Sequence, residues 1–292
     1  MNNTKIEFQP VFIIGAPRSG TNILRDVLCQ FKGVSTWPCD EINYIWRHGN
    51  IRYPYDNFPE KFATYKVTEF IRNQFLILAN KSSAKYVVEK TCANSLRVPF
   101  VESIFPEAKY IYIVRNGVDV VASAAKRWKA DLDIPYIIKK SKYIPKRDIP
   151  FYVLQYSLNR LFKIISKDNR LKVWGPRIND DKILLDKSRS IEEICALQWN
   201  ECVRSSDKAF SSISKDRIHY LKYEDFVINP EIEIKKISIF LGWNVPDNFL
   251  NESVLTVNNS SVGKGKKNMD NRLLKRYYPL MGESMKFHDY GI

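Results

Sequence analysis

The chain has 292 residues, 45% hydrophobic and 13% aromatic, which is enough apolar material for a buried core and excludes wholesale disorder. The 46 Lys and Arg against 32 Asp and Glu give a formal net charge of +14, which favours anionic partners: nucleotides, nucleic acid, acidic glycans or an anionic membrane surface. The five cysteines form no CxxC pair, and no apolar run approaches the roughly 20 residues of a membrane span, so we expect a soluble, cytoplasmic protein.

Predicted strands alternate with predicted helices along the chain. The apolar run 11–14 ends at Gly15 and predicts a buried strand, and residues 23–31 then place apolar side chains at helical spacing. Further strands are predicted at 85–90, 109–115 and 218–225, and further helices at 118–128 and, opened by Pro230, at 231–243. This alternation predicts an α/β fold, in which a central parallel sheet is flanked by helices on both faces.

Residues 130–190 interrupt the alternation. This segment is rich in lysine, contains several prolines and carries the aromatic stretch PFYVLQYSLNRLF, so we predict a mostly helical insertion over one end of the sheet. A helix is predicted at 190–210, where Ser190 as N-cap and Glu193 form a capping-box pattern. We interpret 1–292 as a single domain in which 130–190 forms an acceptor-side lid, and the alternative is that this segment is simple surface elaboration.

The stretch GAPRSGTN, which begins at Gly15, predicts an anion site between the first strand and the first helix. A helix N-terminus presents backbone N–H groups to an anion, and Gly15 and Gly20 let a phosphate approach closely. The glycine spacing is that of a Walker P-loop, but Thr21 and Asn22 stand where that loop has its lysine and its Mg²⁺-binding hydroxyl. Arg18 supplies positive charge from within the loop, so the pattern favours an anion transfer without a metal.

A second cluster consists of Arg115, Ser123 and Arg127. Ser123 and Arg127 share one helix face, and Arg115 approaches that face from the end of the preceding strand. Two guanidinium groups and a hydroxyl make a good pocket for a phosphate monoester. The alternative is a pair of surface salt bridges with Asp119 and a serine that caps the helix.

Together, GAPRSGTN and the Arg115 to Ser123 spacing resemble the sulfotransferase family that uses 3′-phosphoadenosine 5′-phosphosulfate (PAPS). The form PRSGT is more similar to the Golgi, tyrosylprotein and bacterial members than to the cytosolic ones. The resemblance continues in VVEKTCANSLRVPFVESIFPEAKYIYIVRNGVDVVAS and YLKYEDFVINPEIEIKKISIFLGW, and so covers most of the chain outside 130–190. The chain departs from the family pattern at Asn22, at Cys92, where proline usually follows KT, and at Asn116 and Gly117, which replace Asp-Pro.

The resemblance implies a P-loop-like fold and in-line transfer of a sulfuryl group from PAPS to an acceptor hydroxyl, with 3′,5′-ADP as product and no metal required. It implies that the first loop holds the 5′-phosphosulfate and that the second cluster holds the 3′-phosphate. Tyr223 would lie near the adenine, and a late basic loop would close on the 3′-phosphate side. The implied donor-binding residues are Gly15, Arg18, Ser19, Gly20, Thr21, Asn22, Arg115, Ser123, Arg127, Tyr223, Ser261, Gly263, Lys264 and Gly265.

The resemblance also implies the catalytic groups. Arg18 would stabilise charge on the leaving group, and Lys90 matches a family lysine near it, although a lysine at a strand end is otherwise simply solvated. The acceptor must lose a proton, so a general base is expected. We favour Glu41, with Asp40 second, and the alternative is that one of them caps the next helix. His48 is a rival base, but it does not match the position of the histidine in cytosolic relatives.

The acceptor is less defined by the sequence. Aromatic and basic residues of the insertion, namely Tyr136, Tyr143, Trp174 and Arg177, favour a saccharide, while a lipid, a peptide tyrosine or a small metabolite stays open. Two other functions are weighed: a P-loop kinase or NTPase, and a non-catalytic protein that binds polyanions or nucleic acid. We expect no nucleic-acid partner, because the lysines are dispersed and no aromatic RNA-binding strand motif is present. The sequence does not indicate an oligomeric state.

Overall fold

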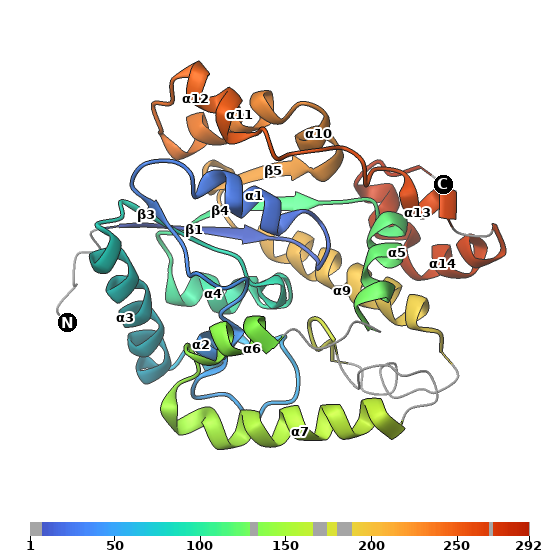
Figure 1. Ribbon diagram of the computed structural model, residues 1–292, viewed down its shortest axis with the longest axis horizontal. Helices are drawn as coiled ribbons and strands as arrows, with labels where there is room; N and C mark the ends of the chain where they lie inside the picture. Colours follow the sequence, from blue (N-terminus) through green and yellow to red (C-terminus); the bar gives the residue numbers. More distant parts are fainter. Residues whose placement is uncertain (1–7, 129–133, 166–173, 180–188, 269–270, 292) are drawn as a thin grey trace.

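A computed structural model of the chain describes residues 8–128, 134–165, 174–179, 189–268 and 271–291 (Figure 1). Its centre is a parallel sheet of five strands in the order β2-β3-β1-β4-β5. The strands are β1 (Gln9–Ile14), β2 (Val34–Ser35), β3 (Tyr86–Glu89), β4 (Lys109–Val114) and β5 (Ile218–Lys222). The predicted α/β class with a central parallel sheet is confirmed.

The central strand β1 is buried on both faces. Phe12 and Ile14 pack into one hydrophobic cluster, and Val11 and Ile13 pack into another on the opposite side of the sheet. A strand covered on both faces needs no polar alternation, which explains the continuous apolar run that was predicted here.

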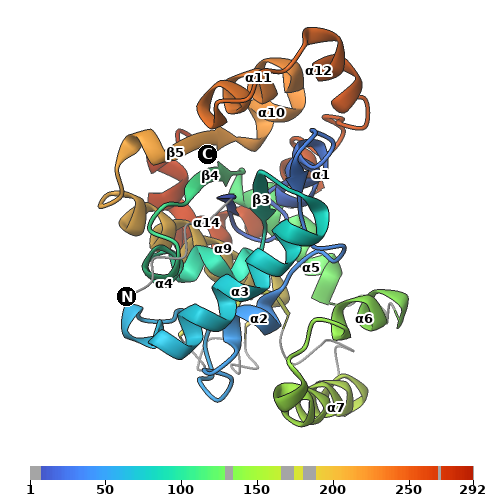
Figure 2. The ribbon, with the colours of Figure 1, turned by 90° about the vertical axis from the view of Figure 1, so that its left-hand side faces the viewer.

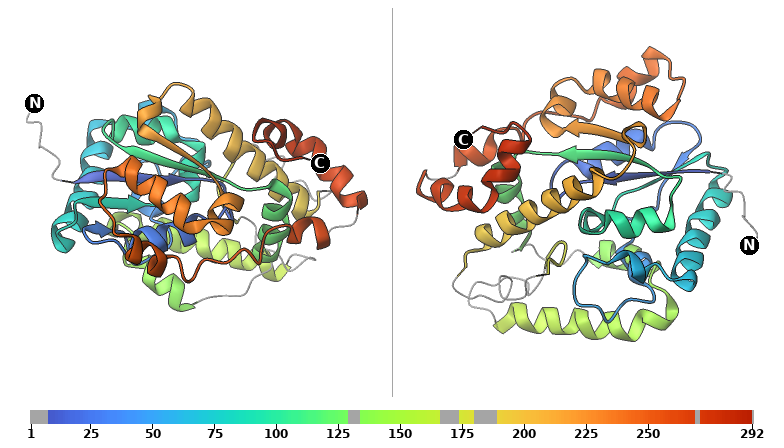
Figure 3. Two further views of the ribbon diagram at one scale, coloured as in Figure 1. Left: turned by 90° about the horizontal axis from the view of Figure 1, so that it is seen from above. Right: turned by 180° about the vertical axis from the view of Figure 1, so that it is seen from behind.

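Helices cover the two faces of the sheet (Figures 1 and 3). One face carries α1 (Thr21–Leu28), α10 (Tyr223–Ile228), α11 (Pro230–Leu241) and α12 (Asp247–Ser253). The other carries α2 (Asn43–Arg47), α3 (Tyr65–Ser82), α4 (Val98–Ile104) and α9 (Ile191–Phe210), with α5 (Gly117–Trp128), α13 (Lys264–Asn268) and α14 (Asn271–Phe287) grouped beside α9. Short 3-10 turns lie at Glu60–Phe62, Cys92–Leu96, Lys146–Asp148 and Lys215–Arg217.

The strand order creates the place for a site. From β1 the chain runs outward to β2 and returns to β3 on one side, and then crosses to β4 on the other side of β1. The loops that leave β1, β3 and β4 therefore emerge at the same edge of the sheet and diverge around β1. In open α/β sheets, ligands bind at such a reversal, outside the carboxyl ends of the strands.

Several predicted boundaries were wrong. The strand predicted at 218–225 ends at Lys222, and Tyr223 begins helix α10. Glu224 and Asp225 lie in the first turn of that helix, where carboxylates interact favourably with the helix dipole. The helix predicted at 231–243 ends at Leu241, because Gly242 adopts a left-handed conformation that terminates it. The short strand β2 and the helices α3 and α14 were not predicted.

The described part of the insertion is mostly helical, although residues 174–179 form no helix. It contains α6 (Ile134–Ser141) and α7 (Ile149–Ile165), which lie beside one another away from the sheet (Figure 2). The helical prediction for 129–133, 166–173 and 180–188 concerns residues outside the described ranges. The predicted capping box is confirmed: Ser190 Oγ accepts from the Glu193 N–H at 3.2 Å, and Glu193 Oε2 accepts from the Ser190 N–H at 2.8 Å. Among the described helices, none is long and apolar enough to span a membrane.

Candidate active site

The loop between β1 and α1 requires its two glycines. A Cβ on Gly15 would stand 2.6 Å from the carbonyl oxygen of Ile113 in β4, and a Cβ on Gly20 would stand 2.2 Å from the ring of Tyr223. Gly20 is also the N-cap of α1, in a left-handed conformation, and no side chain caps the helix. The first-turn N–H groups have no partners within the helix, so they can bind an anion at this end.

Arg18 lies at the apex of this loop with a positive φ of 69°. A left-handed conformation costs a non-glycine residue about 1–2 kcal/mol, and such strain gathers at functional sites. Hydrogen bonds hold Arg18 in place: Arg115 Nη1 donates to the Arg18 carbonyl oxygen at 3.0 Å, and Arg18 Nε donates to Ser123 Oγ at 3.0 Å. The two predicted clusters are therefore in direct contact.

The cluster concentrates positive charge. Partial desolvation and the like charges of Arg127 and Arg115 lower the pKa of the Arg18 guanidinium. The nearest described counter-charge of Arg115 is Asp119, whose Oδ2 lies 3.8 Å from Arg115 Nη2. An anion bound among these groups would relieve their mutual repulsion.

The segment predicted as a late basic loop forms turns at 260–263 and then begins helix α13 at Lys264, and it is fastened to the first turn of α5. Asp119 accepts from the N–H groups of Gly263 at 2.8 Å and Gly265 at 2.6 Å, and Arg115 Nη2 donates to the carbonyl oxygen of Ser261 at 2.8 Å. Lys264 remains exposed. Asp119 was weighed from the sequence only as a salt-bridge partner, and its role as an anchor for a loop about 145 residues away in the chain could not be read from local pattern.

Tyr223 forms the floor beneath these groups. Its side chain is buried, the guanidinium of Arg115 lies 4.3 Å above its ring, and its hydroxyl is 2.7 Å from Ser261 Oγ. Two buried polar atoms nearby, Ser19 Oγ and Arg115 Nε, have no hydrogen-bond partner among the described groups. Buried polar atoms are rarely left unpaired, and these two fit a site that is completed by an anionic ligand.

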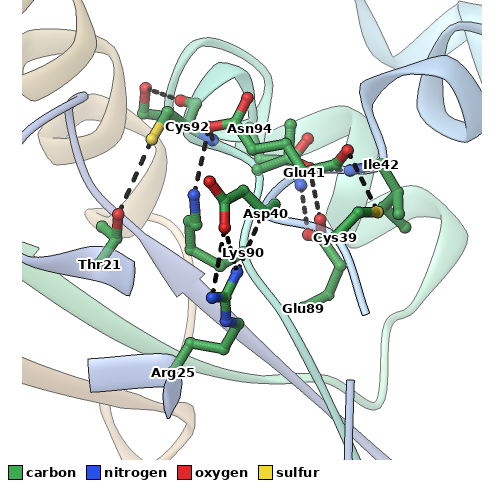
Figure 4. A network of polar contacts seen from close by, with 12 residues as sticks. Thr21, Arg25, Cys39, Asp40, Glu41, Ile42, Glu89, Lys90, Cys92 and Asn94 are labelled. Carbon is green, nitrogen blue, oxygen red and sulfur yellow. Dashed lines mark hydrogen bonds and ion pairs between the residues drawn. The ribbon is translucent and has the colours of Figure 1, made fainter. Parts of the chain in front are cut away.

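Across the loop from this cluster, Glu41 pairs with Lys90 at the end of β3 (Figure 4). Glu41 Oε1 lies 3.3 Å from Lys90 Nζ and also accepts from the backbone N–H of Cys92 at 3.3 Å. Burial alone would raise the pKa of Glu41, but Lys90, Lys140 and the Cys92 hydrogen bonds outweigh it and lower the pKa to about 2. The Glu41 side chain is 26% exposed and the Lys90 side chain only 3%, so the ionised carboxylate is the partner that an acceptor can reach.

The other base candidates lie in different surroundings. Asp40 pairs with Arg25 and not with Lys90: Arg25 Nη2 is 3.5 Å from Asp40 Oδ1 (Figure 4). Neither Asp40 nor Glu41 caps α2, because its N-cap is Ile42 and no side chain bonds to it. His48 Nδ1 lies 2.8 Å from Asp148 Oδ2.

In the part of the chain that the structure describes, no three His, Cys, Asp or Glu side chains gather in a way that could hold a metal ion.

Residues 10–137 match the sequence model of the sulfotransferase family, whereas no curated protein matches the chain. The fold is similar to that of the sulfotransferase domain from the curacin biosynthetic pathway, with a TM-score of 0.59 at 14% identity, covering 98% of this chain and 99% of that one. It is also similar to the sulfotransferase domain from the Synechococcus PCC 7002 olefin synthase (0.58, 14%, covering 98% and 96%) and to a mouse sulfotransferase complexed with PAP (0.51, 14%, covering 95% and 85%).

Proposed function

We propose that this chain, which belongs to the sulfotransferase family, transfers a sulfuryl group from PAPS to an acceptor hydroxyl and releases 3′,5′-ADP. The observation that carries the proposal is the convergence of Arg18, Arg115 and Arg127 at the uncapped N-terminus of α1, with the Glu41–Lys90 pair nearby. The mouse sulfotransferase of similar fold binds PAP, which is 3′,5′-ADP, and this supports the same donor here.

The donor would lie along the carboxyl edge of the sheet. Backbone N–H groups of the loop that ends at Gly20, together with Arg18, suit the 5′-phosphosulfate, and Ser123 and Arg127 suit the 3′-phosphate. The loop at 261–265 would close the 3′-phosphate side, where Asp119 fastens it. Tyr223 supports the site from beneath, and its predicted place near the adenine remains a prediction.

In the transfer, the acceptor oxygen forms a bond to sulfur while the bond from sulfur to the bridging phosphate oxygen breaks. The proton of the acceptor hydroxyl passes to the carboxylate of Glu41, which is ionised and accessible. Negative charge develops on the leaving phosphate, where Arg18 and Lys90 would stabilise it.

The insertion supplies the acceptor side in this proposal. Lys140 of α6 contributes to the low pKa of Glu41, so it lies within electrostatic reach of the base. Its Nζ is 5.7 Å from the ring centroid of Tyr44, which in turn makes an edge contact with Tyr152 of α7 at 4.5 Å. Aromatic faces beside a cation suit a saccharide that carries an acidic group. Incubation with labelled PAPS and a panel of glycans, peptides and metabolites tests this choice.

A change in the late loop should weaken donor binding without touching the catalytic groups. In Gly265→Ala, the new Cβ would stand 2.5 Å from the Val118 carbonyl oxygen, and backbone atoms cannot move aside easily. Overpacking of this kind costs about 1–3 kcal/mol, so calorimetry should give a Kd for 3′,5′-ADP that is about tenfold higher. The control Gly282→Ala, whose Cβ would lie 3.8 Å from its nearest neighbour, should bind normally. Equal affinities in the two variants would remove the loop from the donor site.

Thermal shift separates this function from the two rivals. At about 100 times its Kd, 3′,5′-ADP without metal should stabilise the protein by ~2.7 kcal/mol, and ATP with Mg²⁺ should do much less. Stabilisation by ATP and Mg²⁺ alone would favour a P-loop kinase or NTPase. Nanomolar binding of nucleic acid without any binding of PAPS would favour the non-catalytic polyanion-binding protein, which the charge of +14 also suits.

A further inference from the structure

The end of β3 holds Glu41 and the residue that follows it at two separate points. The N–H of Cys92 donates to Glu41 Oε1 at 3.3 Å, and the N–H of Ile42 donates to Thr91 Oγ1 at 3.2 Å. Lys90, Thr91 and Cys92 are consecutive, so one short segment contacts the carboxylate and also fixes the backbone beside it. Figure 4 shows Glu41, Lys90 and Cys92 directed toward one another.

Glu89 fixes the hydroxyl of Thr91. Thr91 Oγ1 donates to Glu89 Oε1 at 2.5 Å, and because a hydroxyl has one proton, the same oxygen is left to accept from Ile42. Burial raises the pKa of Glu89 to about 7, although the hydrogen bond from Thr91 and the charge of Lys90 lower it. A buried carboxyl is unfavourable unless it is hydrogen-bonded, and the two oxygens of Glu89 accept from Thr91 and Asn94.

A second branch from Glu89 reaches the same stretch of chain. Glu89 Oε2 accepts from Asn94 Nδ2 at 2.9 Å, and Asn94 Oδ1 accepts from Arg97 Nε at 2.9 Å. Arg97 Nη2 then donates to Asn43 Oδ1 at 2.6 Å. Asp56 Oδ1 lies 3.5 Å from Arg97 Nη1 and 2.7 Å from Arg47 Nη1, so the two arginines share this carboxylate. Through these bonds, Glu89 is tied to both residues that follow Glu41.

The backbone N–H of Cys92 is available only because the residue is not proline. The family pattern that the chain resembles has proline here, and proline has no N–H to donate. Thr91 is extended (φ −123°, ψ 114°), as a residue before proline prefers, and Cys92 opens a 3-10 turn, where proline is tolerated. The backbone is therefore compatible with proline, and we expect the hydrogen bond to Glu41 to be the main loss on such a change.

We propose that Glu89, Thr91 and Cys92 are positioning residues that hold the carboxylate of Glu41 and its backbone in the orientation for proton transfer. The inference rests on the proposed function. In this chain the amide of Cys92 donates a hydrogen bond to Glu41, and a proline at the same position could not donate it.

Cys92→Pro compared with Cys92→Ala tests the amide, since alanine removes the thiol and keeps the N–H. Release of labelled sulfate from PAPS, with water as the acceptor, measures the rate without a known acceptor. We expect the kcat of Cys92→Pro to be at least about tenfold below that of Cys92→Ala, because small misplacements of a catalytic group are costly. The Kd for 3′,5′-ADP and the Tm should be similar in the two variants.

Thr91→Val compared with Thr91→Ser tests the hydroxyl. Valine should speed hydrogen exchange of the Ile42 amide and lower kcat about tenfold, and serine should restore both, with the Kd for 3′,5′-ADP unchanged. If the wild type neither binds 3′,5′-ADP nor turns over PAPS, the proposed function fails. If the wild type is active but proline equals alanine at Cys92, and valine equals serine at Thr91, this inference alone fails.

Discussion

Glu41→Gln is expected to lower the turnover of PAPS by about 10²–10⁴-fold, the usual contribution of a general base. Glutamine has the same shape, and its amide oxygen can still face Lys90 Nζ and the Cys92 N–H, which lie 3.3 Å from Glu41 Oε1. It cannot accept the proton of the acceptor hydroxyl. The Kd for 3′,5′-ADP, measured by calorimetry, should therefore be nearly unchanged while kcat falls.

Two further variants define what this result means. Glu107→Gln is the matched control, because Glu107 is a partly exposed carboxylate paired with Arg72 at 3.1 Å just before β4, at the opposite edge of the sheet. Asp40→Asn separates the two candidate carboxylates, and we expect a smaller loss than for Glu41 because Asp40 faces Arg25. Full activity in Glu41→Gln would discard Glu41 as the base.

The low pKa of Glu41 affects its strength as a general base. At a pKa of about 2 the carboxylate is ionised throughout the neutral range, but it is a weak base while Lys90 and Lys140 neutralise it. In the proposed mechanism, the phosphosulfate brings negative charge to Lys90. An added anion weakens the field of that lysine at Glu41 and raises the basicity of the carboxylate. The base would then be strongest when the donor is bound.

Local sequence was sufficient for four of the five strands in the described sheet and for the glycine loop that follows β1. The run that ends at Gly15 has the continuous apolar character of a strand buried on both faces, and the glycine spacing marks the turn that follows. The predicted end of the last strand was wrong, because the β-like sequence pattern continues past Lys222 although Tyr223 begins a helix. There, tertiary packing of the ring against Gly20 and Arg115 coincides with the end of the strand.

The supporting contacts could not be predicted in the same way. Ile42 and Thr91 are 49 positions apart, and they meet only because β3 pairs with β1 on the side where the chain returns. Asp119 in α5 and Gly265 in α13 are 146 positions apart, and they meet because the irregular segment 254–263 brings the chain back to α5. Such pairs depend on register and loop path, which single-sequence patterns do not encode. Glu89 directly precedes the Lys-Thr pair, so its place in the sequence indicated that it would lie near Lys90. No sequence pattern indicated that its carboxyl would be buried.

Arg18→Ala is expected to have the second large effect, a fall in kcat of about 10²–10³-fold, the usual cost of losing one group that stabilises developing charge. Alanine also has a Cβ, so residue 18 should have about the same backbone strain at its φ of 69°. The hydrogen bond from Arg115 to the carbonyl oxygen of residue 18 involves only backbone at that position and should remain. The measurement is kcat for release of labelled sulfate from PAPS, alongside the Kd for 3′,5′-ADP.

Ser123→Ala distinguishes transition-state stabilisation from donor binding. Ser123 accepts from Arg18 Nε at 3.0 Å but is proposed to bind the 3′-phosphate, so its loss should raise the Kd for 3′,5′-ADP more than it lowers kcat. Arg204→Ala, on an arginine that is 67% exposed on α9, is the control for loss of one positive charge and should change neither quantity. If Arg18→Ala weakened binding of 3′,5′-ADP but left kcat unchanged, Arg18 would hold the donor equally in the ground state and the transition state. Its assignment to the leaving-group charge would then be wrong.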